Sequence, residues 1–299
     1  MGRERPAGVR YRKLTKELFA MFAVVTGAAS GIGREVALQL AERGYAVAIS
    51  DRDAEGLATT ANDITSRGGT VADQRTVDVT DVEAVKAWAD DVVSTHGAPD
   101  QVHHVAGIAI WGDVRQMPHE KWQRVIDVNL MGSVHMVEAF APKLMESQPV
   151  RRRRRDRRKF VFVSSAAGII GLPWHAAYSA SKGGVLGMCE VLRFDLAPFG
   201  VDVHAVAPGA VDTPLVRTID IHGVDRSKKR IQKATSLFQG HAVTPTKAAQ
   251  KILKGVDKGK YLINTSGDIP VARWAQVNAP WAYKGVMKAL NAGFRWASK

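Results

Sequence analysis

The sequence predicts one α/β domain built on a doubly wound, mostly parallel seven-stranded sheet with helices on both faces. Short apolar runs of strand length alternate with stretches of helical spacing from residue 22 to about 266. A glycine-rich turn directly follows the first of these runs. Strands separated by helices imply right-handed parallel crossovers, which is why the sheet is expected to be doubly wound.

Six apolar runs suit buried parallel strands, because such strands are covered on both faces. They lie at residues 22–26, 46–50, 101–105, 160–163, 201–206 and 261–264. Between them, Val85, Trp88 and Val92 recur on one helical face. Thr244 followed by Pro245 predicts a helix start, with an N-cap and a proline at the first helical position.

Cysteine content and apolar run length indicate the compartment. Cys189 is the only cysteine among the 299 residues, so no intrachain disulfide can form and a reducing compartment is favoured. No apolar run approaches the roughly 20 residues that span a bilayer. We expect a cytoplasmic protein, peripheral at a membrane surface at most.

The net charge of +13 is concentrated in two short segments. Residues 1–16 supply +5 and residues 151–159 supply +7, which leaves the rest of the chain close to neutral. We expect residues 1–18 to form a basic tail and the arginine run to be a solvated loop. Few aromatic residues interrupt the run, so no nucleic-acid partner is expected.

A phosphate-binding turn is predicted after the first strand. Three glycines at a strand-to-helix turn let the backbone approach a pyrophosphate, while the free N–H groups of the helix start face it. A simple tight turn is the alternative, and the strand before and the helix after favour cofactor binding. The candidate cofactor contacts here are Gly27, Ser30, Gly31, Ile32 and Gly33.

The acid at the end of the second predicted strand favours NAD over NADP. Asp51 can accept hydrogen bonds from the ribose hydroxyls of NAD and would repel the extra phosphate of NADP. Arg52, which follows it, is also a candidate cofactor contact and partly offsets that repulsion. The alternative for Asp51 is a solvated loop acid.

Tyr178 and Lys182 stand at i and i+4 in a predicted helix, so they share one face. A free tyrosine has a pKa near 10, and a neighbouring ammonium would favour its phenolate, which makes Tyr178 a candidate acid and base. Such a pair is common on helices, where it is usually only solvated. Ser165, at the end of the strand predicted over 160–163, could hold a substrate oxygen beside it.

Taken together, these motifs resemble the short-chain dehydrogenase/reductase family over roughly residues 20–266. The match rests on several motifs in the family's order and spacing: the glycine loop, Asp78-Val79, Ala106-Gly107, Asn129, Ser165, Tyr178, Lys182 and Pro208-Gly209.

The resemblance implies a role for each catalytic residue. Ser165 would orient the substrate carbonyl or hydroxyl, Tyr178 would transfer the proton, and Lys182 would lower the pKa of Tyr178 and bind the nicotinamide ribose. Asn129 matches the asparagine that holds a water in the proton relay. Hydride would pass between the nicotinamide and the substrate carbon, a step that the cofactor supplies.

The resemblance also implies further cofactor contacts. Asp78 and Val79 would meet the adenine, and the segment of Pro208, Gly209, Val211 and Thr213 would cover the nicotinamide carboxamide. Ala106 and Gly107, after the fourth predicted strand, complete the set. No metal ligand is assigned.

One motif departs from the family. Its members usually have Asn-Asn-Ala-Gly where this chain has His104-Val105-Ala106-Gly107. The first asparagine normally helps to tie the sheet together, so His104 must supply that bond or leave it to other groups. We assign no chemical role to His103, His104 or His175.

The substrate is expected to be an apolar alcohol or ketone, such as a steroid, a terpenoid or a lipid-derived compound. The family builds its substrate lid after the cofactor-covering loop, here over about residues 214–240, where apolar and basic residues mix. Trp111 and Trp174 lie near the expected pocket. Ordinary core packing explains these tryptophans nearly as well.

Residues 19–267 are thus expected to form the catalytic domain, and residues 268–299 an amphipathic extension. Tyr283, Val286, Met287, Leu290 and Phe294 fall on one helical face, with basic residues elsewhere. Such a helix could lie on an anionic membrane, cover a neighbouring subunit or cover its own pocket. The resemblance suggests a homodimer or homotetramer built on helices around residues 122–146 and 178–196.

Two functions remain open at this point. The first is an active NAD(H) oxidoreductase, and the second is a cofactor-binding scaffold or sensor that docks an anionic partner or a membrane through its basic segments. The serine, tyrosine, lysine and asparagine set favours the enzyme, because a binding module needs none of the four.

Overall fold

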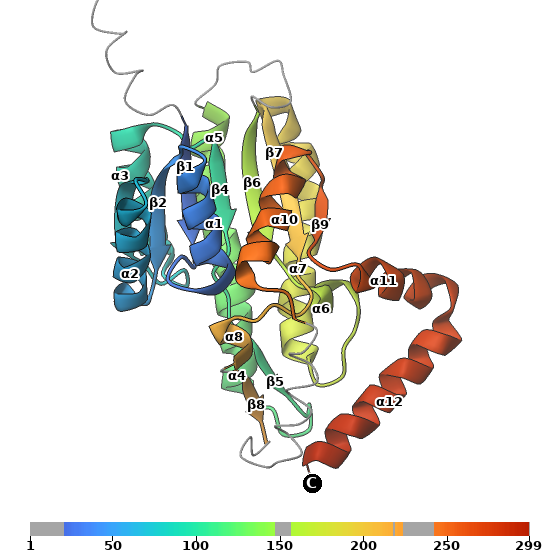
Figure 1. Cartoon of the computed structure of the whole chain (residues 1–299). Helices are drawn as coiled ribbons and strands as arrows, with labels where there is room; N and C mark the ends of the chain where they lie inside the picture. Colours follow the sequence, from blue (N-terminus) through green and yellow to red (C-terminus); the bar gives the residue numbers. More distant parts are fainter. Residues whose placement is uncertain (1–20, 147–156, 218, 224–241, 299) are drawn as a thin grey trace, which may run out of the picture.

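A seven-stranded parallel sheet forms the centre of the computed structural model (Figure 1), which describes residues 21–146, 157–217, 219–223 and 242–298. Its strand order is β3-β2-β1-β4-β6-β7-β9, and all neighbours are parallel. The predicted fold class is confirmed. The strands are β1 (Phe22–Thr26), β2 (Ala46–Asp51), β3 (Thr70–Thr76), β4 (Gln101–His104), β6 (Arg158–Val163), β7 (Val201–Ala207) and β9 (Leu262–Asn264).

Helices cover both faces of this sheet because alternate residues of each buried strand point to opposite sides. Val25 of β1 packs in the cluster of α1 (Gly31–Glu42), α2 (Ala54–Ser66) and α10 (Pro245–Asp257). Val24 packs in the cluster of α3 (Val82–His96), α5 (Gly132–Glu146) and α7 (Ala176–Asp195).

Smaller elements surround the carboxyl end of the sheet. They are α4 (His119–Ile126), a π-helical turn (Asp127–Met131), α6 (Ala166–Ile169) and α8 (Pro214–Arg217). A separate parallel pair, β5 (Ile110–Gly112) and β8 (Asp220–His222), lies beyond them. A 3₁₀ turn (Ala197–Phe199) precedes β7 at the opposite end of the sheet. Two helices, α11 (Asp268–Asn278) and α12 (Pro280–Ser298), form an arm that leaves the sheet after β9 and turns back at its far end (Figure 1).

The strand predictions miss one strand and shorten another. β3 pairs only with β2 at the sheet edge and has no fully buried residue, so it lacks the apolar run of a central strand. β6 begins at Arg158, two residues before the predicted start, because the Arg158 guanidinium is buried and donates to the carbonyl of Leu144.

The end of the arginine run therefore has a structural role rather than that of a solvated loop. Arg157 pairs with Asp202 at 2.6 Å, and Lys159 donates to the carbonyl of Arg157 at 2.7 Å. The first part of the run, residues 151–156, lies outside the described residues.

The order of the strands places a crevice beside β1. From β1 the chain runs outward to β3 and then returns to β4 on the other side of β1. Ligands of doubly wound sheets bind outside the carboxyl ends of the strands at such a switch point. The glycine loop and the Ala106-Gly107 pair both follow strands that end here.

A side-chain hydrogen bond joins the two strands at the switch point. The ring Nδ1 of His104 lies 2.8 Å from Thr26 Oγ1, which also accepts the backbone N–H of Val105 at 3.2 Å. Because Thr26 Oγ1 accepts from the backbone, its own proton is directed to Nδ1, which leaves the ring proton on Nε2. His104 thus supplies the tie between strands that the family's asparagine would otherwise make.

Burial lowers the pKa of His104 to about 3, with weaker contributions from the charges of Lys182 and His135. The folded chain then keeps His104 neutral while the unfolded chain protonates it below about pH 6.5, so stability falls as pH drops from 6.5 towards 3. We expect this histidine alone to cost about 2–3 kcal/mol of unfolding free energy at pH 4.5 relative to pH 7.

Urea unfolding of the wild type and of His104→Asn at pH 7 and pH 4.5 measures this effect. The variant should lose less stability than the wild type between the two pH values. His119→Asn, which changes an exposed histidine, should behave like the wild type. Equal losses in wild type and His104→Asn would contradict the neutral buried ring.

Candidate active site

The glycine loop approaches the end of β4 so closely that no side chain fits. A Cβ on Gly27, whose φ is +70°, would lie 2.6 Å from the backbone nitrogen of Ala106. A Cβ on Gly33 would lie 2.0 Å from the carbonyl oxygen of Gly27. These glycines let the first turn of α1 stand directly behind the loop, with its free N–H groups at the crevice.

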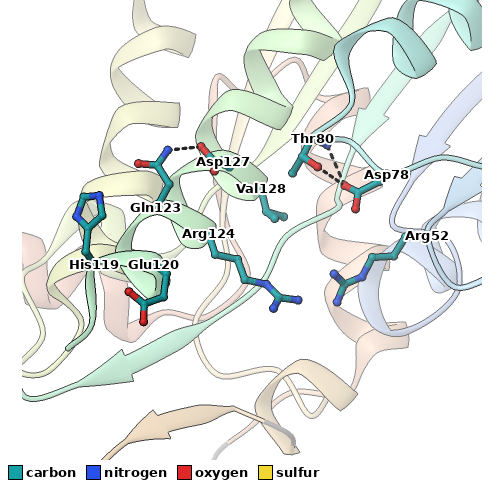
Figure 2. A pocket seen from close by; sticks show the side chains of 9 residues that line it. All are labelled: Arg52, Asp78, Thr80, His119, Glu120, Gln123, Arg124, Asp127 and Val128. Carbon is teal, nitrogen blue, oxygen red and sulfur yellow. Dashed lines mark hydrogen bonds between the residues drawn. The ribbon is translucent and has the colours of Figure 1, made fainter. Parts of the chain in front are cut away.

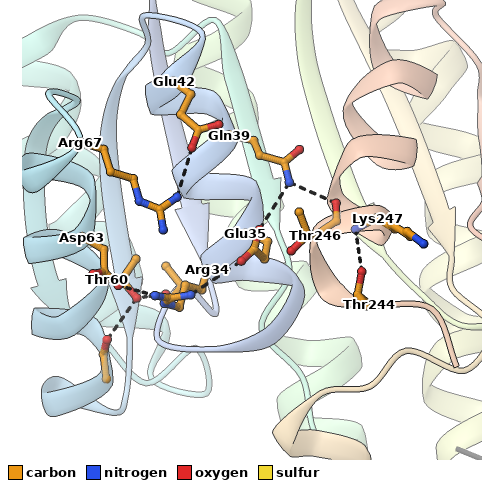
Figure 3. A network of polar contacts seen from close by, with 12 residues as sticks. Arg34, Glu35, Gln39, Glu42, Thr60, Asp63, Arg67, Thr244, Thr246 and Lys247 are labelled. Carbon is orange, nitrogen blue, oxygen red and sulfur yellow. Dashed lines mark hydrogen bonds and ion pairs between the residues drawn. The ribbon is translucent and has the colours of Figure 1, made fainter.

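Neighbouring helices hold this loop in place. The buried Thr60 hydroxyl of α2 donates to the carbonyl of Ala28 at 2.8 Å. Arg34 pairs with Asp63, which joins α1 to α2, and Gln39 donates to the carbonyl of Thr246 at 3.1 Å, which joins α1 to α10 (Figure 3). The predicted helix start at Thr244 is confirmed, since its side chain accepts from the Lys247 N–H.

Asp51 lies at the end of β2, with its carboxylate turned towards the glycine loop. Its two oxygens accept the backbone N–H groups of Ala29 at 3.0 Å and of Asp53 at 3.1 Å. Each carboxylate oxygen has a further lone pair, so ribose hydroxyls can still donate to it. Ser30 precedes α1 in an extended conformation, and its side chain makes no capping hydrogen bond.

A cavity of about 450 Å³ opens beside Arg52, the residue that follows Asp51 (Figure 2). Arg52 reaches into it from one side and Arg124 of α4 from the other, and neither forms an ion pair with another described residue. Asp78, which accepts from the N–H and hydroxyl of Thr80, forms part of the wall. The lining residues are Arg52, Asp78, Thr80, His119, Glu120, Gln123, Arg124, Asp127 and Val128.

Val79 is turned away from this cavity. Its side chain is buried against Gly132 at the start of α5, and its carbonyl oxygen lies 2.8 Å from the His135 ring nitrogen Nδ1. An adenine contact by Val79 would therefore have to come from the backbone N–H.

The segment predicted to cover the nicotinamide lies across the carboxyl edge of the sheet. The carbonyl of Pro208 accepts the N–H of Ala166 at 2.9 Å, and the N–H of Gly209 donates to the Thr265 hydroxyl at 3.2 Å. The Thr213 side chain lies against Gly31, so the segment reaches the glycine loop. Val211 forms an isolated β-bridge with Val243.

Most of the predicted lid, residues 218 and 224–240, lies outside the described residues. Its described part forms α8 and β8. β8 pairs with β5, a contact that the sequence analysis did not anticipate.

Ser165 and Tyr178 meet between α6 and α7. Ser165 is the N-cap of α6, where its oxygen accepts the N–H of Ala167 at 3.2 Å, and its hydroxyl lies close enough to Tyr178 to act on the pKa of that tyrosine. Its neighbour Ser164 is buried and donates to the carbonyl of Lys182 at 2.8 Å. The two adjacent serines therefore differ: Ser164 is structural, and Ser165 faces the tyrosine.

Lys182 and Asn129 lie on either side of Gly107. A Cβ on Gly107 would lie 3.1 Å from Lys182 Nζ and 3.0 Å from Asn129 Oδ1, so the absence of a side chain there leaves room for both. Lys182 donates to the carbonyl of Val163 at 2.9 Å. The structure thus brings together all four predicted catalytic residues around the ends of β4 and β6.

Asn129 stands in the π-helical turn between α4 and α5. The wider turn leaves backbone groups outside the usual helical ladder, and such turns are frequent at functional sites. The Asn129 side chain accepts from the Ile108 N–H at 2.8 Å and donates to Ser181 Oγ at 3.0 Å. Its backbone carbonyl accepts from the Ser133 hydroxyl at 2.7 Å. Asn129 is fully buried and held at both ends.

Burial dominates the electrostatics of the site. It raises the pKa of Tyr178, and the neighbouring Ser165 hydroxyl partly opposes this. Burial instead lowers the pKa of Lys182 itself to about 8. A buried ammonium close to its neutral point is sensitive to any charge brought beside it.

Apolar and aromatic side chains surround Tyr178. Ile110, Val125 and Ala177 form a buried cluster against which Tyr178 packs together with Ile108, Met117 and Trp122. The Trp111 ring lies 4.0 Å from that of His175, and burial lowers the pKa of His175 to about 4. At neutral pH this wall therefore carries no charge.

Several site residues were not predicted. Ser181 lies between Tyr178 and Lys182 in the sequence and was passed over, although it holds Asn129. Arg124 gave no signal of its own, because an arginine on the polar face of a helix is common. Only the packing of α4 beside the end of β3 brings it opposite Arg52.

Comparison with known proteins agrees with this geometry. The family model described as short chain dehydrogenase matches residues 21–222. The chain belongs to the short-chain dehydrogenase family. Its seven-stranded sheet is the Rossmann nucleotide-binding fold of that family.

Two relatives from Mycobacterium tuberculosis are each 37% identical to the chain. One, the probable oxidoreductase EphD, matches over 240 residues, which cover 79% of this chain but only 39% of EphD. The other, the putative oxidoreductase SadH, matches over 243 residues, which cover 80% of this chain and 83% of SadH.

Two solved structures have the same fold. A short-chain dehydrogenase/reductase from Burkholderia phymatum in complex with NAD has a TM-score of 0.74 and 25% identity, covering 86% of this chain and 92% of its own. An actinorhodin polyketide ketoreductase with NADPH has a TM-score of 0.70 and 30% identity, covering 83% and 97%. The two structures hold different dinucleotides, so they leave the choice of cofactor open.

Proposed function

We propose that this chain is an NAD(H)-dependent oxidoreductase that interconverts a secondary alcohol and a ketone. The approach of the Ser165 hydroxyl to Tyr178, with Lys182 and Asn129 around Gly107, supports this most directly. The glycine loop, which has no space for side chains at Gly27 and Gly33, fits a pyrophosphate. A cofactor bound along the switch point would supply the hydride chemistry.

In the proposed mechanism, Ser165 and Tyr178 hold the substrate oxygen between their hydroxyl groups. For ketone reduction, Tyr178 gives its proton to the oxygen as negative charge develops there. The raised pKa of Tyr178 suits this direction, because the phenol stays protonated at neutral pH. Lys182 and Asn129, both buried, stabilise the phenolate and connect it to a proton supply.

Tyr178→Phe removes the acid while keeping the ring. Because general acid–base catalysis contributes about 10²- to 10⁴-fold, we expect kcat to fall by that factor with little change in cofactor affinity. NADH fluorescence during turnover of a panel of apolar alcohols and ketones measures kcat. Tyr45→Phe, at the opposite end of the sheet, is the control and should keep wild-type kcat. Equal turnover in the wild type and Tyr178→Phe would show that another group moves the proton.

The proposed preference for NAD(H) rests on the orientation of Asp51. Its carboxylate is fixed by two backbone N–H groups at the end of β2, where the adenosine ribose of a bound dinucleotide would lie. A 2′-phosphate there would meet a negative charge that cannot turn away. Arg52 nearby is exposed and offers only a solvent-screened attraction.

Fluorescence titrations with NADH and NADPH test this preference. The wild type should bind NADH more tightly, and Asp51→Asn should narrow the ratio of the two dissociation constants by about tenfold, which corresponds to about 1.4 kcal/mol of repulsion removed. Arg52→Gln should weaken NADPH binding alone. Tighter binding of NADPH than of NADH by the wild type would disprove the assignment.

The apolar cluster around Tyr178 supports an apolar substrate, such as a steroid, a terpenoid or a lipid-derived ketone. Its members leave few polar groups to recognise a charged or highly hydroxylated molecule. His175, kept neutral by burial, adds to this character.

We also propose a homodimer or homotetramer built on the helices around residues 122–146 and 178–196. Val191 and Phe194 of α7 are 58% and 62% exposed. Large apolar side chains gathered on one exposed helix are typical of an interface.

Peripheral contact with an anionic membrane is a further part of the proposal. None of the helices in the described part of the chain has the length and apolar character needed to cross a bilayer. Trp274, Trp281 and Trp296 of the arm are exposed, and no acidic residue follows Asp268. Tryptophans beside lysines and arginines suit the interfacial zone of an anionic bilayer.

Sedimentation with vesicles tests the membrane contact. The wild type should sediment with phosphatidylglycerol-containing vesicles and much less with neutral phosphatidylcholine vesicles. The double variant Lys284→Glu, Lys288→Glu should lose most of this preference for anionic vesicles. Each basic residue near the membrane surface contributes about 1 kcal/mol of binding free energy. Equal sedimentation of wild type and double variant would exclude the arm as the anchor.

A further inference from the structure

The last helix contacts the loop that leads to Tyr178 at two separate points. The Tyr283 hydroxyl donates to the carbonyl of Gly171 at 2.9 Å. The Phe294 ring stacks on the Trp174 ring, with centroids 5.5 Å apart and planes 21° apart. Eleven residues of helix, or roughly 16 Å, separate the two contacts. The α12 helix therefore lies along the loop rather than touching it once.

This loop, residues 171–175, lies between Ser165 and Tyr178 and holds an unusual backbone conformation. Trp174, with φ of +68°, is the only non-glycine residue in the described part of the chain with a positive φ. A bulky residue in that region is strained and persists only where its surroundings hold it. Here the Trp174 carbonyl accepts the N–H of Gly112 at 2.9 Å, and Phe294 covers the ring.

His175 links this covered tryptophan to the catalytic tyrosine. Its buried ring lies 6.5 Å from that of Phe294, 4.0 Å from that of Trp111 and 6.4 Å from that of Tyr178. A continuous set of aromatic contacts thus runs from α12 to the reacting hydroxyl. Because interiors are closely packed, loss of the Phe294 ring would be felt along the set.

Between its two contacts, α12 leaves apolar side chains uncovered. Val286 and Leu290 lie on the same helical face as Tyr283 and Phe294, yet they are 56% and 43% exposed. Trp281, which is 81% exposed, lies on the opposite, basic face. The inner stripe, Val286 and Leu290, is therefore distinct from the surface proposed for membrane contact.

We propose that α12 is the outer wall of the substrate site, with the apolar part of the alcohol or ketone lying along the inner stripe. Phe294 then acts as a positioning residue, which holds Trp174 and His175 beside Tyr178. The two contacts of α12 place the stripe beside this loop, and His175 of the loop packs near Tyr178, so the position of the stripe favours the substrate over a second copy of the chain. The inference rests on the proposed oxidoreductase function.

The α12 helix lies outside residues 21–222, the part that the family model matches. The family model therefore does not describe this wall. Such a wall would select substrates by the length and apolarity of the part that lies away from the reacting carbon. The reaction at Tyr178 would stay that of a simple ketone.

Kinetics with a series of 2-alkanones from butanone to 2-decanone, at saturating NADH, test this wall. In the wild type, each added methylene that reaches the stripe should raise kcat/KM by up to about fourfold, from about 0.8 kcal/mol per buried CH₂. Leu290→Gln, at an exposed position that tolerates a polar residue, should flatten that dependence for the long ketones and leave butanone and NADH binding unchanged.

Phe294→Ala should raise KM for the long ketones, and Phe294→Tyr, which keeps the ring, should restore it. Trp281→Ala, on the opposite face, is the matched control and should keep the wild-type dependence on chain length. If the wild type, Leu290→Gln and Phe294→Ala show the same dependence of kcat/KM on chain length, the proposed wall is wrong. The proposed oxidoreductase function would still stand. No turnover of any ketone by the wild type would overturn the proposed function and the wall together.

Discussion

The close approach of two backbone segments at the switch point is the constraint on which the rest of the site depends. Gly27 and Ala106 follow neighbouring strands and come within contact distance, so neither the loop nor the strand end can shift alone. The hydrogen bond between Thr26 and His104 closes the same junction from inside the sheet. Everything that would touch a dinucleotide is arranged around this point.

The proposed catalytic residues are fixed by the same kind of crowding. Gly107 is one residue past Ala106, and the space left by its missing side chain is shared by Lys182 and Asn129. The π-helical segment directs Asn129 inward, and hydrogen bonds with Ser181 and the Ile108 backbone hold its side chain there. A buried lysine and a buried amide in one small volume cost desolvation energy, which is acceptable where their function requires it.

Outside this rigid centre, the chain adds elements with looser contacts. The arm of α11 and α12 leaves the sheet after β9 and returns to the substrate side, where Tyr283 and Phe294 contact the loop before Tyr178. One face of α12 therefore belongs to the active-site side and the other carries exposed tryptophan and lysine. In the two proposals above, this division would let a single helix serve an apolar substrate on one side and an anionic surface on the other.

The sequence by itself determined the fold class, the family and the grouping of Ser165, Tyr178 and Lys182, because periodicity and motif spacing are local properties of the chain. It missed β3, since an edge strand needs no apolar run, and it placed the start of β6 too late, since Arg158 is buried by partners far away in the sequence. It left the role of His104 open. Only the tertiary structure decided that His104 ties β1 to β4, that burial governs both pKa values, and that α12 returns to the substrate loop. Each of these outcomes depends on which distant residues meet in space, and no spacing along the chain encodes that.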